Sequence, residues 1–214
     1  MNAHDLRKAI IATALRMNAL GINQGKAGNV SARSDDGYLV TPSGLAYEET
    51  SAADIVRMDL QGNTSGRRTP SSEWRFHQDI YLARPEVNAI VHTHSPYATT
   101  LACMGLEIPA FHYMVAVAGG KNIRCAPYAT FGTQALSDHA VAALQGRNAC
   151  LLANHGLIAV GPLLKAALAL AVEVESLCGQ YWRVLQIGKP ILLSDAEMDV
   201  VLEKFRTYGQ AGAE

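Results

Sequence analysis

The stretch Asn88-Ala-Ile-Val-His-Thr-His94, which Ser95-Pro96 follows, decides the fold of this chain. Its apolar residues predict a strand, and Ser95-Pro96 predicts the start of a helix directly after it. His92 and His94 are two residues apart, so on a strand their side chains share one face of the sheet, while Thr93 points to the other face. The stretch therefore predicts a strand that ends in two neighbouring imidazoles.

Helix and hairpin signals alternate on both sides of this strand. Apolar residues recur at helical spacing over Leu6–Met17, and Gly21 stands where a C-cap glycine belongs. The turn residues Asp35-Asp36-Gly37 predict a hairpin between two short strands. A long apolar segment over Cys150–Val160 is divided by a second turn at Asn154-His155-Gly156.

The mixture of strands and helices predicts the fold class. We expect further helices from Pro70 to the residue before Pro85, over 133–144, over 162–186 and after a Ser194–Glu197 capping box. Because hairpin signals join the strands, we predict an α/β fold, a three-layer α/β/α sandwich with a largely antiparallel central sheet. No repeat or linker interrupts the 214 residues, so we expect a single domain over 1–214.

Composition excludes several classes of protein. Apolar residues make up 49% of the chain and the net charge is -1, with no basic block, so nucleic acid is not an expected partner. Charged residues interrupt the apolar N-terminus, and we expect neither a secretory signal nor a membrane span. The four cysteines are widely spaced in apolar surroundings, and we expect core thiols of a cytoplasmic protein: Cys103, Cys125, Cys150 and Cys178.

Histidine and glutamate residues offer a candidate metal site. His92 and His94 can converge on one ion, and zinc accepts imidazole together with carboxylate oxygen. His155, in the sharp turn of an apolar segment, and Glu73, at the start of a helix, are further candidate donors. A His-X-His pair alone is more often not a metal site, and spacing does not join these four residues. The other histidines that we considered, His77, His112 and His139, are interpreted as structural.

Three short segments have the chemistry of an anion site. Gly28-Asn29 offers a backbone N–H and a side-chain amide, and Ser43-Gly44 offers a hydroxyl on a flexible backbone. Ser71 and Ser72 offer hydroxyls and free N–H groups at a helix N-terminus, where the dipole favours negative charge. Each pair taken alone is more often a turn or a cap. Lys26 stands close by and adds a positive charge, to which we assign no role.

The chain resembles a known family over several specific strings. AGNVSAR, TPSG, SSEWRFH, VHTHS, HYMVAVAGG, CAPYATFGT, NHGLIA and VLEKFRTYG, in this order and spacing, are similar to the class II aldolase and adducin-head family over about Gly25 to Gly209. The resemblance implies that four residues bind Zn²⁺: Glu73, His92, His94 and His155. It also implies a phosphate site at Gly28, Asn29, Ser43, Gly44, Ser71 and Ser72.

The implied activity is retro-aldol cleavage of a ketose 1-phosphate, with L-fuculose 1-phosphate or a close analogue as the expected substrate. The products are dihydroxyacetone phosphate and a small aldehyde such as L-lactaldehyde. Class II aldolases use the metal as the sink for the electrons of the broken C3–C4 bond. The resemblance further implies that Glu73 ligates the metal and moves the proton, and that Tyr113 serves the aldehyde oxygen.

Other activities of the same family remain alternatives. Pentulose-phosphate 4-epimerases typically carry aspartate in place of Glu73 and an acid after the HYM-like stretch, whereas 114–124 contains no acidic residue. Phosphosugar dehydratases, sugar-acid decarboxylases and aldolases for 5-deoxypentulose phosphates are further possibilities. A non-catalytic, adducin-like interaction module is an alternative of another class, although adducin heads lack the metal ligands.

The resemblance also implies an assembly. Members form cyclic homotetramers with active sites at subunit interfaces, so we expect a homotetramer here. The apolar helix expected over 162–186 offers surface for such contacts, but it serves equally well as core. By resemblance, Tyr208, near the chain end, reaches a neighbouring subunit's site and acts there.

Overall fold

The computed structural model describes residues 2–207 and contains one mixed sheet of eight strands in the order β4-β3-β2-β1-β5-β8-β7-β6. Neighbouring strands pair antiparallel, except that β6 and β7 are parallel. The largely antiparallel sheet was expected from the hairpin signals and is confirmed. The strands are β1 (Asn29–Ser34), β2 (Gly37–Val40), β3 (Val56–Asp59), β4 (Thr64–Ser65), β5 (Ala89–Thr93), β6 (Cys125–Ala126), β7 (Ala149–Leu152) and β8 (Gly156–Gly161).

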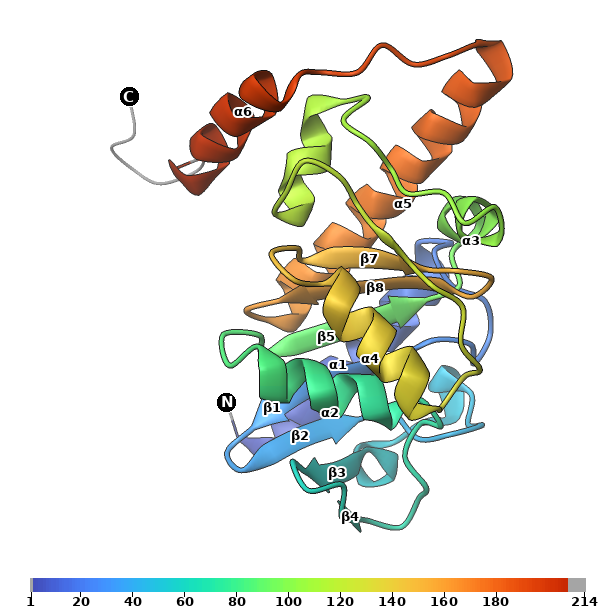
Figure 1. Cartoon of the computed structure of the whole chain (residues 1–214). Helices are drawn as coiled ribbons and strands as arrows, with labels where there is room; N and C mark the ends of the chain where they lie inside the picture. The colour runs from blue at the N-terminus through green and yellow to red at the C-terminus, as the bar shows by residue number, and fades with distance from the viewer. Residues whose placement is uncertain (1, 208–214) are drawn as a thin grey trace.

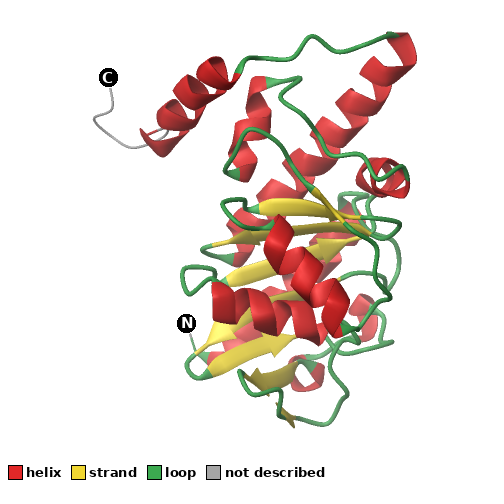
Figure 2. Ribbon diagram, viewed as in Figure 1, coloured by secondary structure: helices red, strands yellow, loops and turns green. Residues whose placement is uncertain are grey.

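Helices cover both faces of the sheet. In Figures 1 and 2, α2 and α4 lie together across one face, while α1 and the lower part of α5 lie behind it. The three-layer α/β/α arrangement is therefore confirmed. The helices are α1 (Ala3–Ala19), α2 (Trp74–Ala83), α3 (Pro96–Cys103), α4 (Gln134–Ala143), α5 (Leu164–Ile187) and α6 (Asp195–Thr207), with 3-10 turns η1 (Tyr47–Glu49), η2 (Ala52–Asp54) and η3 (Tyr113–Ala118).

Each face of the sheet has its own hydrophobic core. Ile90 packs with α2 and α4, whereas its neighbour Val91 packs with α1 and α5. Both are fully buried, because successive side chains of a strand point to opposite faces and here both faces are covered. β5 is therefore apolar along most of its length, and its polar residues gather at its C-terminal end.

Two glycines allow the chain to come close to that end of β5. Gly28 precedes β1 and has φ +66°, and a Cβ built there would lie 2.4 Å from the carbonyl oxygen of His92. On the other side of β5, a Cβ on Gly156 would lie 2.3 Å from the carbonyl oxygen of Thr93. Contacts this short exclude any side chain, so glycine at both positions lets β1 and β8 flank the histidine-bearing strand.

The helix after β5 is anchored by a residue far away in the sequence. Ser95 occupies the N-cap position of α3, but its side chain makes no capping hydrogen bond. Instead, the buried carboxylate of Glu175 in α5 accepts hydrogen bonds from the backbone N–H groups of Tyr97 and Ala98, both at 2.8 Å. These hydrogen bonds satisfy backbone N–H groups that have no partner within the first turn of α3, and they hold α3 against α5.

Helix boundaries agree with most sequence signals. Gly21 follows the end of α1 with φ +70°. Ser194, directly before α6, and Glu197, in its first turn, form the expected capping box. The long helix was expected from Pro162 but begins at Leu164. Over residues 2–207, no helix is both long and apolar enough to cross a bilayer.

Candidate active site

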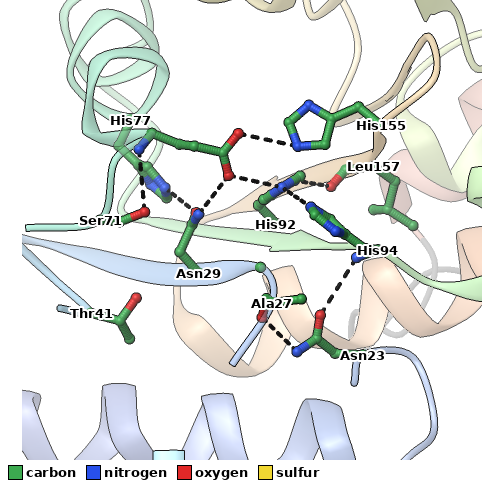
Figure 3. A network of polar contacts seen from close by, with 12 residues as sticks. Asn23, Ala27, Asn29, Thr41, Ser71, His77, His92, His94, His155 and Leu157 are labelled. Atoms are coloured by element: carbon green, nitrogen blue, oxygen red, sulfur yellow. Dashed lines mark hydrogen bonds and ion pairs between the residues drawn. The ribbon is translucent and has the colours of Figure 1, made fainter. Parts of the chain in front are cut away.

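Four side chains meet at the C-terminal end of β5. Glu73 is the N-cap residue of α2, His92 lies in β5, His94 follows β5, and His155 lies in the turn between β7 and β8. One potential ligand atom from each lies within 4.8 Å of those from the other three. Figure 3 shows the three imidazoles turned toward one another. Tertiary structure thus assembles a set that sequence spacing did not join.

Hydrogen bonding orients the ring of His92 within this cluster. Its Nδ1 lies 2.9 Å from the carbonyl oxygen of Leu157 in β8. A carbonyl oxygen can only accept, so Nδ1 is the donor of this bond, and Nε2 is the ring nitrogen left to offer a lone pair to a metal. That Nε2 faces the cluster, 3.1 Å from Nε2 of His94. A backbone carbonyl on the far ring nitrogen is the usual support of a metal-binding histidine.

The turn that carries His155 is held in an unusual backbone conformation. Asn154 has φ +56°, and it is the one residue other than glycine with positive φ among residues 2–207. Asn tolerates this left-handed region better than most residues. The turn directs His155 back over the sheet, where its Nε2 lies 3.1 Å from Glu73 Oε1.

Glu73 is buried, and its two oxygens have different surroundings. Oε2 accepts a hydrogen bond from Asn29 Nδ2 at 3.0 Å and lies 3.2 Å from His92 Nε2. Oε1 makes no hydrogen bond to any described residue. Burial raises the pKa of Glu73, but the imidazoles of His92 and His155 more than offset this and hold its pKa well below the usual range. The group is therefore a carboxylate at neutral pH.

The donors present fit a divalent cation. Partial burial of the ring is the largest cause that lowers the pKa of His94 to about 4, and repulsion from His92 and His155 adds to it. This imidazole is therefore neutral at pH 7. Glu73 offers a buried carboxylate oxygen without a hydrogen bond, and one ligand atom from each of the four residues lies within 4.8 Å of the others. A set of three imidazoles and one carboxylate suits Zn²⁺ and leaves room for a substrate oxygen.

The six residues predicted to bind phosphate line one cleft beside this cluster. The cleft has a volume of about 330 Å³, and Glu73, His94 and His155 form part of its wall. Lys26 lies at the same wall, where its Nζ is 3.3 Å from the carbonyl oxygen of Gly44. The predicted anion-binding residues in the lining are Gly28, Asn29, Ser43, Gly44, Ser71 and Ser72.

Several details of this cleft differ from the sequence-based expectation. α2 begins at Trp74, so Ser71 and Ser72 precede the helix rather than open it. The N–H of Ser71 is not free, because it donates to the carbonyl oxygen of Thr41 at 3.0 Å. The side-chain amide of Asn29 is likewise engaged with other protein groups, since its oxygen faces His77 Nε2 at 2.5 Å and its nitrogen donates to Glu73.

Of the two predicted catalytic tyrosines, only Tyr113 is among the described residues. Tyr113, at the start of η3, is 51% exposed and lies beside Val201 and Phe205 of α6 rather than in the lining of the cleft. Tyr208 lies outside the described residues. Tyr113 is therefore not placed at the candidate metal site by the fold of the single chain.

Three aromatic residues that line or support the cleft were not identified from the sequence. Tyr128 and Phe131 are 60% and 64% exposed and line the mouth of the cleft. Tyr47 donates its hydroxyl toward the carbonyl oxygens of Ala27 and Gly28 and so supports the loop before β1. Their position follows from packing, because nothing in the spacing of 128–131 relates this loop to the histidines.

The cysteines follow the prediction only in part. Cys150 and Cys178 are buried, and burial raises the pKa of both thiols above the usual range. Cys125 is partly buried, but Cys103 is exposed at the end of α3, so the expectation of a core thiol is wrong there. All four are free.

Comparison with known proteins assigns the family. The family model for the class II aldolase and adducin N-terminal domain matches residues 8–182. The chain is 59% identical to the 5-methylthioribulose-1-phosphate/5-deoxyribulose-1-phosphate aldolase of Rhodospirillum rubrum, over 95% of this chain and 92% of that protein. It is 51% identical to the L-fuculose phosphate aldolase of Escherichia coli strain K12, over 98% of each chain.

A solved structure shows the same fold. An L-fuculose 1-phosphate aldolase superposes with a TM-score of 0.92 at 40% identity, covering 94% of this chain and 96% of that one. The chain therefore belongs to the class II aldolase family and is an enzyme of this metal-dependent class. The non-catalytic alternative is excluded by the same observations.

Proposed function

We propose that this enzyme cleaves a ketose 1-phosphate between C3 and C4 to dihydroxyacetone phosphate and a small aldehyde, with Zn²⁺ as its metal. One observation carries the proposal: the anion-binding residues and the Glu73–histidine cluster line the same cleft of about 330 Å³. A phosphate held by one wall would place the reacting carbons beside the other. Such positioning accounts for much of the catalysis in an enzyme of this kind.

The residues of the chain have distinct parts in this reaction. Glu73, His92, His94 and His155 would hold the metal. A divalent metal at this position supplies a Lewis acid for the electron pair that the broken bond leaves behind. Glu73 is ionised and buried at this cluster, so it is the group that would deliver a proton to C3 once the C3–C4 bond has broken, and would remove that proton from the hydroxymethyl carbon of dihydroxyacetone phosphate in the reverse direction.

The phosphate would be held mainly by neutral donors. The loop glycines and the hydroxyls of Ser43, Ser71 and Ser72 provide such donors, and Ser72 precedes the N-terminus of α2. We assign the phosphate to Gly28, Asn29, Ser43, Gly44, Ser71 and Ser72, with Asn29 contributing chiefly through its backbone because its side-chain amide already has two partners.

The substrates that we propose share the phosphate end and differ at the aldehyde end. L-Fuculose 1-phosphate would release L-lactaldehyde, and the resemblance to the two fuculose phosphate aldolases supports it. The relative at 59% identity favours a second candidate, 5-methylthioribulose 1-phosphate or 5-deoxyribulose 1-phosphate. Tyr128 and Phe131 at the cleft mouth offer apolar surface to the methyl or methylthio group that ends each of these substrates.

We further propose a homotetramer in the cytoplasm, in which each active site takes residues from a neighbouring subunit. Tyr113 supports this, because it is half exposed and lies outside the cleft of its own chain. Tyr113 of one subunit would then serve the aldehyde oxygen in the site of the next, and Tyr208 would act there as well. Four free cysteines accord with a reducing compartment.

A cleavage assay on a panel of ketose 1-phosphates tests the proposal. Zinc-loaded protein is incubated with L-fuculose 1-phosphate, 5-deoxyribulose 1-phosphate and 5-methylthioribulose 1-phosphate, and dihydroxyacetone phosphate is measured. We expect release from at least one of them, lost with a chelator and regained with Zn²⁺. Conversion of a pentulose 5-phosphate to its 4-epimer without release of a triose phosphate would instead identify an epimerase.

A further inference from the structure

A line of buried polar side chains leads from Glu73 into the interior. Glu73 Oε2 is 3.0 Å from Asn29 Nδ2, and Asn29 Oδ1 is 2.5 Å from His77 Nε2. His77 Nδ1 is 2.7 Å from Ser31 Oγ, which is 2.8 Å from the hydroxyl of Tyr81. Figure 3 shows His77 beside Asn29, on the side of the cluster away from His155.

Chemistry fixes the direction of every hydrogen bond in this line. The carboxylate of Glu73 can only accept, so Asn29 presents its NH₂ group to Glu73 and its oxygen to His77. Nε2 of His77 must then carry a proton. Burial, followed by the proximity of His92, lowers the pKa of His77 to about 3, so the ring is neutral and its Nδ1 accepts from Ser31. Ser31 in turn accepts from Tyr81.

The line has no access to water. His77 and Ser31 are fully buried, Tyr81 is 1% exposed and Asn29 is 2% exposed. Reversing any one bond would leave two donors or two acceptors facing each other, and a buried polar group without a partner is strongly disfavoured. The alternative orientation of the Asn29 amide, with its oxygen toward the carboxylate of Glu73, is disfavoured for the same reason.

We propose that His77 is a positioning residue that acts through Asn29 to decide which oxygen of Glu73 is free to take the proton. Ser31 donates to Nδ1, so Nε2–H of His77 is held on the oxygen of Asn29, and the NH₂ group of the same amide holds Oε2. Oε1 accepts no hydrogen bond from a described residue and faces His155 Nε2 at 3.1 Å on the cluster side, so it is left as the oxygen that exchanges the proton with substrate. This inference rests on the acid–base role of Glu73 in the proposed function.

The test compares His77→Met with His77→Gln. Glutamine carries an N–H donor close to the position of Nε2, whereas methionine has a similar size and no donor, so the pair isolates the hydrogen bond from the volume of the side chain. Readouts are kcat and KM for cleavage, metal content, thermal stability, and deuterium incorporation into the hydroxymethyl group of dihydroxyacetone phosphate in D₂O. The exchange reaction isolates proton transfer, because it needs no aldehyde.

The expected result separates proton transfer from binding and folding. In His77→Met, kcat and the exchange rate should fall about tenfold to a hundredfold, as is common when the support of a site residue is lost. KM should change by less than about threefold and metal content should be retained, since none of the metal-binding candidates is altered. His77→Gln should recover most of the exchange rate.

A double-mutant cycle shows whether the effect passes through Asn29. If it does, the double variant His77→Met/Asn29→Leu should exchange deuterium almost as fast as Asn29→Leu alone. Additive losses of exchange activity in this cycle would overturn the inference. So would equal losses in His77→Met and His77→Gln that accompany a drop in thermal stability, because His77 would then only fill the core.

Two further measurements keep the result decisive. If His77→Met does not fold, Ser31→Ala replaces it, because this change removes the hydrogen bond that supports Nδ1 of His77, and an unchanged exchange rate would reject the inference. Wild-type protein is assayed beside every variant. Failure of the wild type to cleave any ketose 1-phosphate rejects the proposed function itself, whereas an active wild type with equally active variants rejects only the role of His77.

Discussion

The carbonyl oxygen of Leu157 in β8 accepts the Nδ1–H of His92 in β5, between two neighbouring strands of the sheet, at 2.9 Å. The bond is made inside the core, where His92 is fully buried. It turns the other ring nitrogen, Nε2, toward Glu73, His94 and His155. The sheet register therefore sets the orientation of a candidate ligand.

From this relationship we predict that His92→Ala, His94→Ala and His155→Ala each lose metal and activity together. Metal content after extensive dialysis, measured by atomic emission beside the cleavage rate, checks this. His139→Ala is the matched control, because this histidine bonds the carbonyl oxygen of Pro127 and is not among the four clustered residues. A fully active cluster variant that binds no metal would contradict the proposed mechanism.

Glu73→Gln should lower kcat by roughly a hundredfold or more, because the amide cannot take up the proton. The three histidines should retain part of the metal, so metal content should fall less than the rate does. Deuterium exchange into dihydroxyacetone phosphate measures the same step without the aldehyde. Near-normal exchange in Glu73→Gln would show that Glu73 is a ligand and no more.

Lys26→Met should weaken binding of the phosphorylated substrate while leaving kcat close to that of the wild type. Lys26 is the one Lys or Arg among the described residues that line the cleft. It is also exposed, so solvent screens its charge and the expected rise in KM is only about twofold to fivefold. Lys26→Arg serves as the control that keeps the charge, and the effect of Lys26→Met should shrink at high salt. An equal rise in KM for both variants would point to packing rather than charge.

Asp54 provides a test of stability against pH away from the site. Hydrogen bonds from Arg67, Ser51 and Arg68 hold the pKa of this carboxyl well below its usual range. Because the pKa of Asp54 is lower in the folded than in the unfolded protein, the carboxylate stabilises the fold at pH values above its ordinary pKa of about 4. This contribution is lost as the pH falls from about 4 toward the lower pKa of the folded state. Urea unfolding at pH 7 and at about pH 3.5 should therefore show that the stability lost in Asp54→Asn is larger at pH 7.

The control for this experiment is Asp36→Asn. Asp36 also pairs with an arginine, Arg57, but both side chains are largely exposed to water. Its effect on stability should be small at either pH, because exposed ion pairs contribute little. Equal losses in the Asp54 and Asp36 variants would mean that burial of Asp54 is without consequence.

Local sequence determined the secondary structure and most of the helix ends. Alternation at His92 and His94, the hairpin residues around Asp36 and the capping box at Ser194 act over a few neighbouring residues, so they can be recognised without knowledge of the rest of the chain. The fold class followed from the same signals. Residue types at specific strings were also enough to indicate the family.

Only the tertiary structure decided how distant residues meet. Glu73 and His155 are far apart in the chain, yet their side chains lie 3.1 Å apart, because packing of α2 on the sheet and the pairing of β5 with β8 bring them together. The partners of Asn29 and the exposure of Tyr113 were not predicted from the sequence, for the same reason. Hydrogen bonds between side chains depend on which surfaces pack, and packing is a property of the whole fold rather than of any segment.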